Sequence, residues 1–143
     1  MSEGGFDAPE DAAMSGFPAK YCSVIAVRAH RDDAYVLLNT GPHGAPYLYG
    51  VNCSLKSGRW YEGGSANVPG WEQTGLDPDL GTLSIWGEAP AKATGVRVRC
   101  DDEIFEEAVS EGAYLIVWWR VPFTAYWPRV LEFKIDGQWN EQR

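Results

Sequence analysis

The sequence has few basic residues, few histidines and no long hydrophobic run. It contains 12 Lys and Arg against 20 Asp and Glu in 143 residues, which gives a net charge of −8. A nucleic-acid interface needs a basic stripe, and anionic lipids attract segments rich in Lys and Arg. No apolar run approaches the roughly 18 residues that a membrane-spanning helix requires. We therefore expect a protein that binds neither nucleic acid nor a membrane.

Catalytic and metal-binding motifs are also missing. The sequence contains no H-E-x-x-H, P-loop, G-x-G-x-x-G or G-x-S-x-G pattern. Its two histidines, His30 and His43, lie in turn-like segments, and an enzyme would need one of them beside a carboxylate. Cys22, Cys53 and Cys100 are far apart and lack C-x-x-C spacing, which argues against zinc. We predict no catalytic residues, no metal and no cofactor.

The cysteines and the first residues favour a cytoplasmic location. Three cysteines leave at least one thiol unpaired. Cys22 and Cys53 could face each other on neighbouring strands, but reduced thiols that act as small hydrophobic groups are the favoured interpretation. The chain starts without the basic segment and apolar core that a secretory signal requires.

Residues 1–19 differ in composition from the rest of the chain. They contain four acidic residues, no Lys or Arg, and no periodic apolar pattern. This composition predicts a flexible acidic arm ahead of a single domain over residues 20–143. Phe6, Met14 and Phe17 are the side chains with which such an arm would contact the domain or a partner.

Alternating, β-branched and aromatic runs dominate the remaining sequence, with Gly or Pro about every ten residues. This pattern predicts an all-β fold, an antiparallel β-sandwich of about ten short strands. The strongest break, a possible boundary between half-domains, lies at residues 75–81, and the C-terminal half is predicted to be immunoglobulin-like. The expected strands cover residues 20–29, 34–39, 47–55, 59–62, 71–74, 82–88, 95–100, 103–109, 113–121, 129–136 and 138–140.

One pair of charges predicts a strand register. A two-residue turn at 101–102 places Arg97 opposite Glu106 on the returning strand. Such a cross-strand pair contributes only about 0.2–1 kcal/mol, but it supports this alignment over a shifted one.

The seven tryptophans are the most unusual part of the composition. On the predicted strand 113–121 both faces are apolar, and Tyr114, Trp118 and Arg120 share one of them. Core packing and a binding platform are both open for this face, because Trp and Tyr serve both purposes. With Trp127 from the next loop, these residues form our predicted binding surface for a protein partner or a second copy of the chain.

An alternative site lies around the glycine-rich segment that follows Trp60. Trp60 and Trp71 flank this segment, and Asn67 within it has an amide that can bond a ligand. Indole faces stack on sugar rings, so the alternative function is a carbohydrate or small-ligand-binding module.

Three segments together resemble a group of uncharacterised small bacterial β-proteins. They are DAYVLLNT at 33–40, GRW through PGW at 58–71, and LGTLSIWGEAP at 80–90 followed by GAYLIVWW at 112–119. The resemblance covers residues 20–140. It implies an all-β domain and no catalytic residues.

Overall fold

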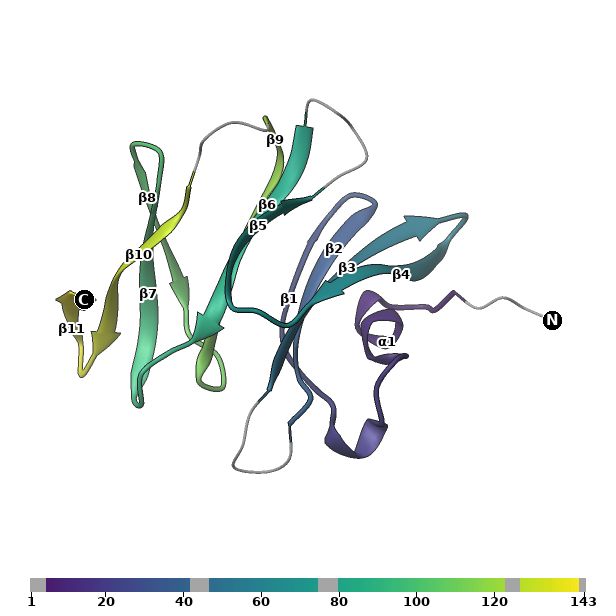
Figure 1. Cartoon of the computed structure of the whole chain (residues 1–143), viewed down its shortest axis with the longest axis horizontal. Coiled ribbons are helices and arrows are strands. Elements are labelled where there is room, and N and C mark those ends of the chain that lie inside the picture. The colour runs from purple at the N-terminus through teal and green to yellow at the C-terminus, as the bar shows by residue number, and fades with distance from the viewer. Residues whose placement is uncertain (1–4, 42–46, 75–79, 123–126, 142–143) are drawn as a thin grey trace. The chain divides into compact units, whose positions relative to one another are not determined.

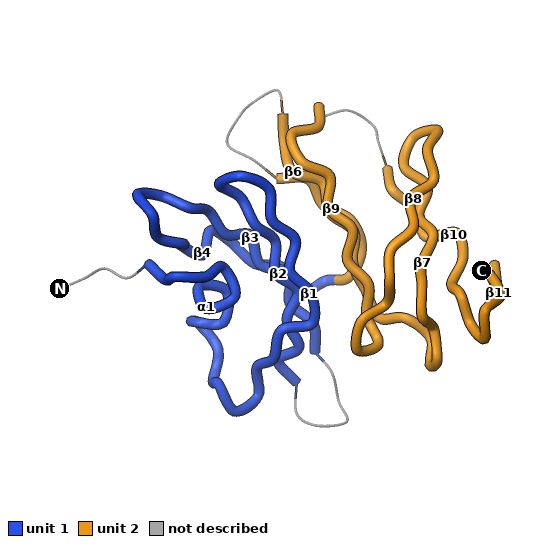
Figure 2. The backbone as a smooth tube through the Cα atoms, turned by 180° about the vertical axis from the view of Figure 1, so that it is seen from behind, with its two compact units in different colours: residues 1–68 blue, residues 69–143 orange. Residues whose placement is uncertain are grey.

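The computed structural model describes residues 5–41, 47–74, 80–122 and 127–141. Contacts divide the chain into two compact units, residues 1–68 and 69–143 (Figure 2). The sequence prediction was one domain over 20–143 with a break at 75–81. The observed boundary comes earlier because the strand over 70–74 pairs within the second unit. Residues 75–79 of the predicted break lie outside the described residues.

Unit 1 contains an antiparallel meander in which each strand pairs with the next (Figure 1). Its second strand is apolar on both sides, and every residue of this strand from Ala34 to Leu38 is buried. The turn at 57–58 has positive φ at Ser57 (51°) and Gly58 (78°), which suits a tight two-residue hairpin. The strands are β1 (Ser23–His30), β2 (Asp33–Asn39), β3 (Leu48–Lys56) and β4 (Arg59–Ala66).

The N-terminal segment packs on this sheet, so the predicted flexible arm over residues 1–19 is wrong for its described part, residues 5–19. Helix α1 (Pro9–Met14) buries Ala12 and Ala13 against the sheet (Figure 1), and the 3-10 turn η1 (Ala19–Tyr21) follows. Phe6 exchanges two 2.8 Å backbone hydrogen bonds with Trp60. The small alanines let the helix approach the strands closely, an effect that acidic composition alone does not reveal.

Unit 2 contains two antiparallel sheets. One has the order β5-β6-β9 and the other the order β11-β10-β7-β8 (Figure 1). The strands are β5 (Gly70–Thr74), β6 (Leu80–Glu88), β7 (Ala93–Cys100), β8 (Glu103–Ala108), β9 (Ala113–Pro122), β10 (Arg129–Ile135) and β11 (Gln138–Glu141).

Side chains from both sheets of unit 2 form one hydrophobic core. Ile85, Tyr114 and Ile116 come from the first sheet, and Val96, Val98 and Phe133 come from the second. Alternation along β7 turns Val96 and Val98 inward and Arg97 outward, as predicted. Arg97 lies opposite Glu106, and its Nε donates to Glu106 Oε2 at 2.9 Å, which confirms the predicted register.

The prediction of an all-β, antiparallel fold is confirmed. The described residues contain eleven strands, each overlapping a predicted range, and one six-residue α-helix. None of the described helices is long and apolar enough to cross a membrane. The three cysteines carry free thiols.

Candidate binding surface

Tyr114 and Trp118, the centre of the predicted platform, face the core of unit 2. Tyr114 is 9% exposed and packs edge-to-face on Phe133. Burial raises the pKa of its phenol. Trp118 is half-buried and meets Phe105 edge-to-face, with ring centroids 5.3 Å apart. The predicted platform is therefore wrong for these two residues, because the second sheet of unit 2 covers this face.

Arg120 is separated from these residues by an irregularity in β9. Pairing between β6 and β9 shifts register between Gly81 and Leu83, and Arg120 has a φ of 52°. A bulge of this kind breaks the alternation that the prediction used to place Arg120 beside Trp118. The Arg120 side chain is exposed.

Trp127, the fourth predicted platform residue, stacks on Trp71 from the alternative site. Their ring centroids lie 6.4 Å apart, and their planes are inclined by 20°. Trp127 is 67% exposed and Trp71 is 45% exposed. The structure thus joins one residue from each predicted set in a single exposed pair. Sequence spacing did not reveal this pair, because 55 residues of chain separate its members.

Trp60 and Asn67, the other alternative residues, lie in unit 1. Trp60 is half-buried and packs against the core under α1. Asn67 Nδ2 donates a 3.0 Å hydrogen bond to Tyr47 Oη. The predicted grouping of Trp60 with a ligand-binding Trp71 is not supported, because the Trp60 ring is part of the packing of unit 1.

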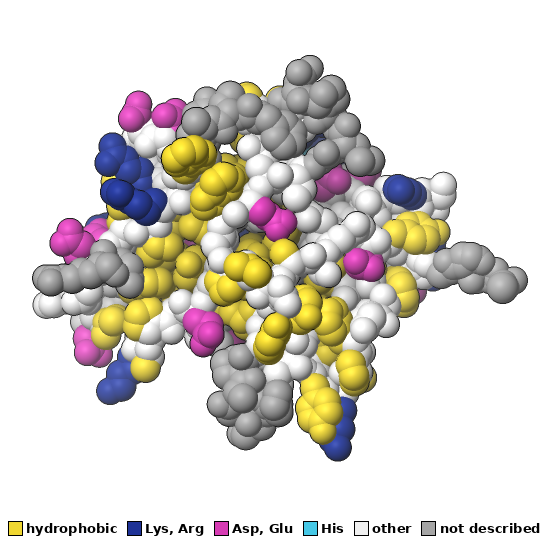
Figure 3. All heavy atoms as spheres, viewed as in Figure 1, with side chains coloured by type: hydrophobic (Ala, Val, Ile, Leu, Met, Phe, Trp, Pro, Cys, Tyr) yellow, Lys and Arg dark blue, Asp and Glu magenta, His cyan; other side chains and the backbone are white. Residues whose placement is uncertain are grey.

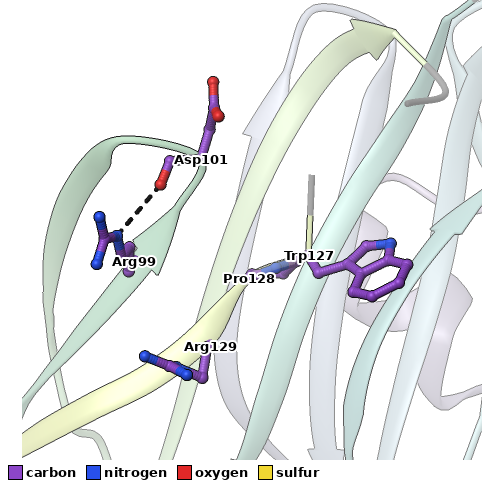
Figure 4. Close-up of a pocket in the computed structure, with 5 residues that line it drawn as sticks. All are labelled: Arg99, Asp101, Trp127, Pro128 and Arg129. Carbon is purple, nitrogen blue, oxygen red and sulfur yellow. Dashed lines mark hydrogen bonds between the residues drawn. The ribbon is translucent and has the colours of Figure 1, made fainter. Parts of the chain in front are cut away.

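Beside Trp127, unit 2 has a shallow hollow of about 440 Å³. Its lining residues are Arg99, Asp101, Trp127, Pro128 and Arg129. Both guanidinium groups point to one side of β10, the indole points to the other, and the Asp101 carboxylate turns away from the guanidinium groups (Figure 4). The sequence analysis missed Arg129. Pairing the predicted strands 95–100 and 129–136 with each other would have identified Arg129, because this pairing places Arg129 opposite Arg99.

The hollow combines positive charge with aromatic surface. In Figure 3, basic side chains gather over β8 and β10, with hydrophobic side chains beside them. Arginine offers a planar fork of N–H donors, and indole offers a broad apolar face. This combination suits non-covalent binding of a group that is both acidic and apolar.

The described residues contain no group of three or more His, Cys, Asp or Glu side chains arranged to hold a metal ion. His30 is half-buried at the end of β1, and His43 lies outside the described residues.

Comparison of this chain with protein-family models, curated proteins and solved structures finds no match. The resemblance to uncharacterised bacterial β-proteins stays a prediction.

Proposed function

We propose that this chain is a non-catalytic binding domain that contacts a protein partner through Trp71 and Trp127. The observation that carries the proposal is the exposed, nearly parallel stack of these two indoles. Tryptophan is among the residues that contribute most to protein interfaces, because it buries a large apolar area with few rotatable bonds. The partner is another protein or a second copy of this chain.

The location of the pair supports this function. Trp71 lies on β5, which is an edge of its three-stranded sheet. Edge strands have unpaired backbone groups, and proteins use such edges to accept a strand from a partner. Trp71 and the edge of β5 together offer apolar area and backbone hydrogen bonds to an extended peptide.

We further propose that unit 2 is an immunoglobulin-like sandwich. Its seven strands divide into sheets of three and four, which supports this classification. The fourth strand, β8, pairs with β7 rather than joining the first sheet, which is a difference from the constant-type antibody domain. We also propose a cytoplasmic location, which the free thiols support.

Selection from a random peptide library on the full chain tests the proposal. We expect enriched peptides that lose at least tenfold in affinity in Trp71→Ala and Trp127→Ala. Tyr21→Ala is the matched control, because Tyr21 is an aromatic residue of unit 1 with a similar exposure of 47%. Light scattering on the same variants tests self-association. If no peptide is enriched and no dimer depends on the two tryptophans, the proposal is wrong.

A carbohydrate ligand is the second candidate, and the exposure of the Trp71 indole favours it. One exposed aromatic face is sufficient to stack on a sugar ring. Binding of the full chain to a glycan array, lost in Trp71→Ala and kept in Tyr21→Ala, would select this function over protein binding.

A further inference from the structure

Two arginines lie directly opposite each other at one end of the second sheet of unit 2. Arg99 on β7 and Arg129 on β10 are cross-strand partners, and both are exposed. Like charges in this arrangement repel each other and destabilise the pairing. The pair is unexpected because the chain has eight more acidic than basic residues, so an arginine would more often be paired with a carboxylate.

Arg97, two residues earlier on the same face of β7, shows how this sheet otherwise neutralises an arginine. Arg97 donates to Glu106 at 2.9 Å and to Glu132 at 3.0 Å. Its guanidinium also lies 4.0 Å from the ring centroid of Trp139. One arginine thus has two carboxylates and an aromatic ring as partners.

Arg99 and Arg129 lack such partners among the described residues. Across β8, Arg99 faces Ile104, a hydrophobic residue that is 59% exposed. Within the described part of the chain, the hydrogen bond from its Nε to the backbone oxygen of Asp101, at 3.3 Å, is the one that its side chain makes. No ion pair joins either Arg99 or Arg129 to a described carboxylate.

We infer that Arg99 and Arg129 together bind one carboxylate of an acidic peptide segment whose apolar residues contact Trp127. This inference rests on the proposed function and specifies the chemistry of the partner. Two opposed guanidinium groups offer enough donors to hold both oxygens of a carboxylate. The hollow of about 440 Å³ is open enough to admit one side chain.

Charge favours a carboxylate over a phosphate or a nucleic acid. Asp101 also lines the hollow, so the three charged side chains sum to one positive charge. That balance suits a monoanion better than a dianion. A phosphate backbone needs a row of cations, and the lining residues of the hollow supply two, Arg99 and Arg129.

The first test uses acetate as the probe and does not depend on the proposed function. Acetate is titrated into the full chain at constant ionic strength, and the arginine Nε–Hε signals are followed by NMR. We expect saturable shifts for Arg99 and Arg129 and none for Arg97, which already has two carboxylates. Chloride is the matched control. Equal shifts for all three arginines, or tighter binding of inorganic phosphate than of acetate, would overturn the inference.

The second test uses the peptides selected on the full chain. We expect them to contain Asp or Glu, and to lose about tenfold or more in affinity in Arg99→Gln and Arg129→Gln, as loss of a charge-assisted hydrogen bond implies. Lys92→Gln is the control. Lys92 directly precedes the first residue of β7, whereas Arg99 is near the last, so this variant removes one positive charge at the other end of the strand.

The outcomes separate this inference from the proposed function. Peptides that require Trp71 and Trp127 but bind Arg99→Gln and Arg129→Gln normally would overturn the inference and leave the function standing. Peptides that require neither tryptophan would overturn both. Replacing the acidic residue of a selected peptide by its amide should cost about as much as the double variant Arg99→Gln/Arg129→Gln, and this peptide should bind the double variant no more weakly than the acidic peptide does.

Discussion

Replacing Trp118 distinguishes a core residue from a platform residue. The indole packs edge-to-face on Phe105 and lies against the core of unit 2. Truncation of a buried aromatic residue to alanine costs roughly 3–5 kcal/mol, and the partial exposure of Trp118 places Trp118→Ala near the lower limit, about 3 kcal/mol. At about 4–8 °C for each kcal/mol in a unit of this size, the Tm falls by more than 10 °C.

The indole nitrogen gives a second, sharper expectation. Trp118 Nε1 is buried and has no hydrogen-bond partner among the described residues, and an unpaired buried donor costs about 1–3 kcal/mol. Trp118→Phe removes this donor along with some apolar area, so the two effects oppose each other. We expect the free energy of unfolding of Trp118→Phe to lie within about 1 kcal/mol of the value for the parent chain.

Urea unfolding followed by far-UV circular dichroism measures both variants. Trp127→Ala is the matched control, because its side chain is 67% exposed and its loss should change the free energy of unfolding by no more than about 0.5 kcal/mol. If Trp118→Ala is as stable as Trp127→Ala, the inward orientation of this face of β9 is wrong.

Three further predictions concern packing and titration. In Gly87→Ala the new methyl group would lie 2.8 Å from Tyr114 Oη, so we expect a loss of about 1–3 kcal/mol in urea unfolding, partly recovered when Tyr114→Phe is added. Ala12→Glu places a charge at a fully buried position, and should cost about 3–5 kcal/mol and abolish amide protection in α1 during hydrogen exchange; unchanged protection would refute the docking of this helix. Burial raises the pKa of the Cys53 thiol from 9.0 to about 12, so the folded chain keeps a proton that the unfolded chain loses, and the free energy of unfolding should fall as pH rises from 9 toward 12. Iodoacetamide at pH 8.5 should accordingly modify Cys22 before Cys53, with labelling sites read by mass spectrometry.

Local patterns in the sequence were sufficient to predict the strands and several registers. Alternation, β-branched residues and turn glycines act between neighbouring positions, so the Lys56–Gly58 turn and the pairing of Arg97 with Glu106 follow from residues close in the chain. The sequence also predicted that both sides of 34–39 are apolar, and the whole of Ala34–Leu38 is buried.

The candidate site depends on contacts between distant residues, and the sequence predicted it only in part. The alternating pattern of 113–121 identified the two faces of β9 but not which one the second sheet covers. Trp71 and Trp127 were named in separate hypotheses, because nothing in their local surroundings indicates that they stack. The predicted arm over residues 1–19 is wrong within residues 5–19 for a similar reason: the composition is acidic, but the packing of this segment depends on two alanines that fit the sheet of unit 1.

The arginine pair in the second sheet is the strongest support for the proposal that unit 2 binds a ligand. Selection for stability alone would place an acidic residue opposite Arg99, as it does twice for Arg97 on the same strand. Instead Arg99 faces a second arginine and an exposed isoleucine. Local features that oppose stability, in a sheet that otherwise obeys its pairing rules, are expected where function has taken precedence. An acidic group from a partner would relieve the repulsion, so binding and sheet stability should increase together.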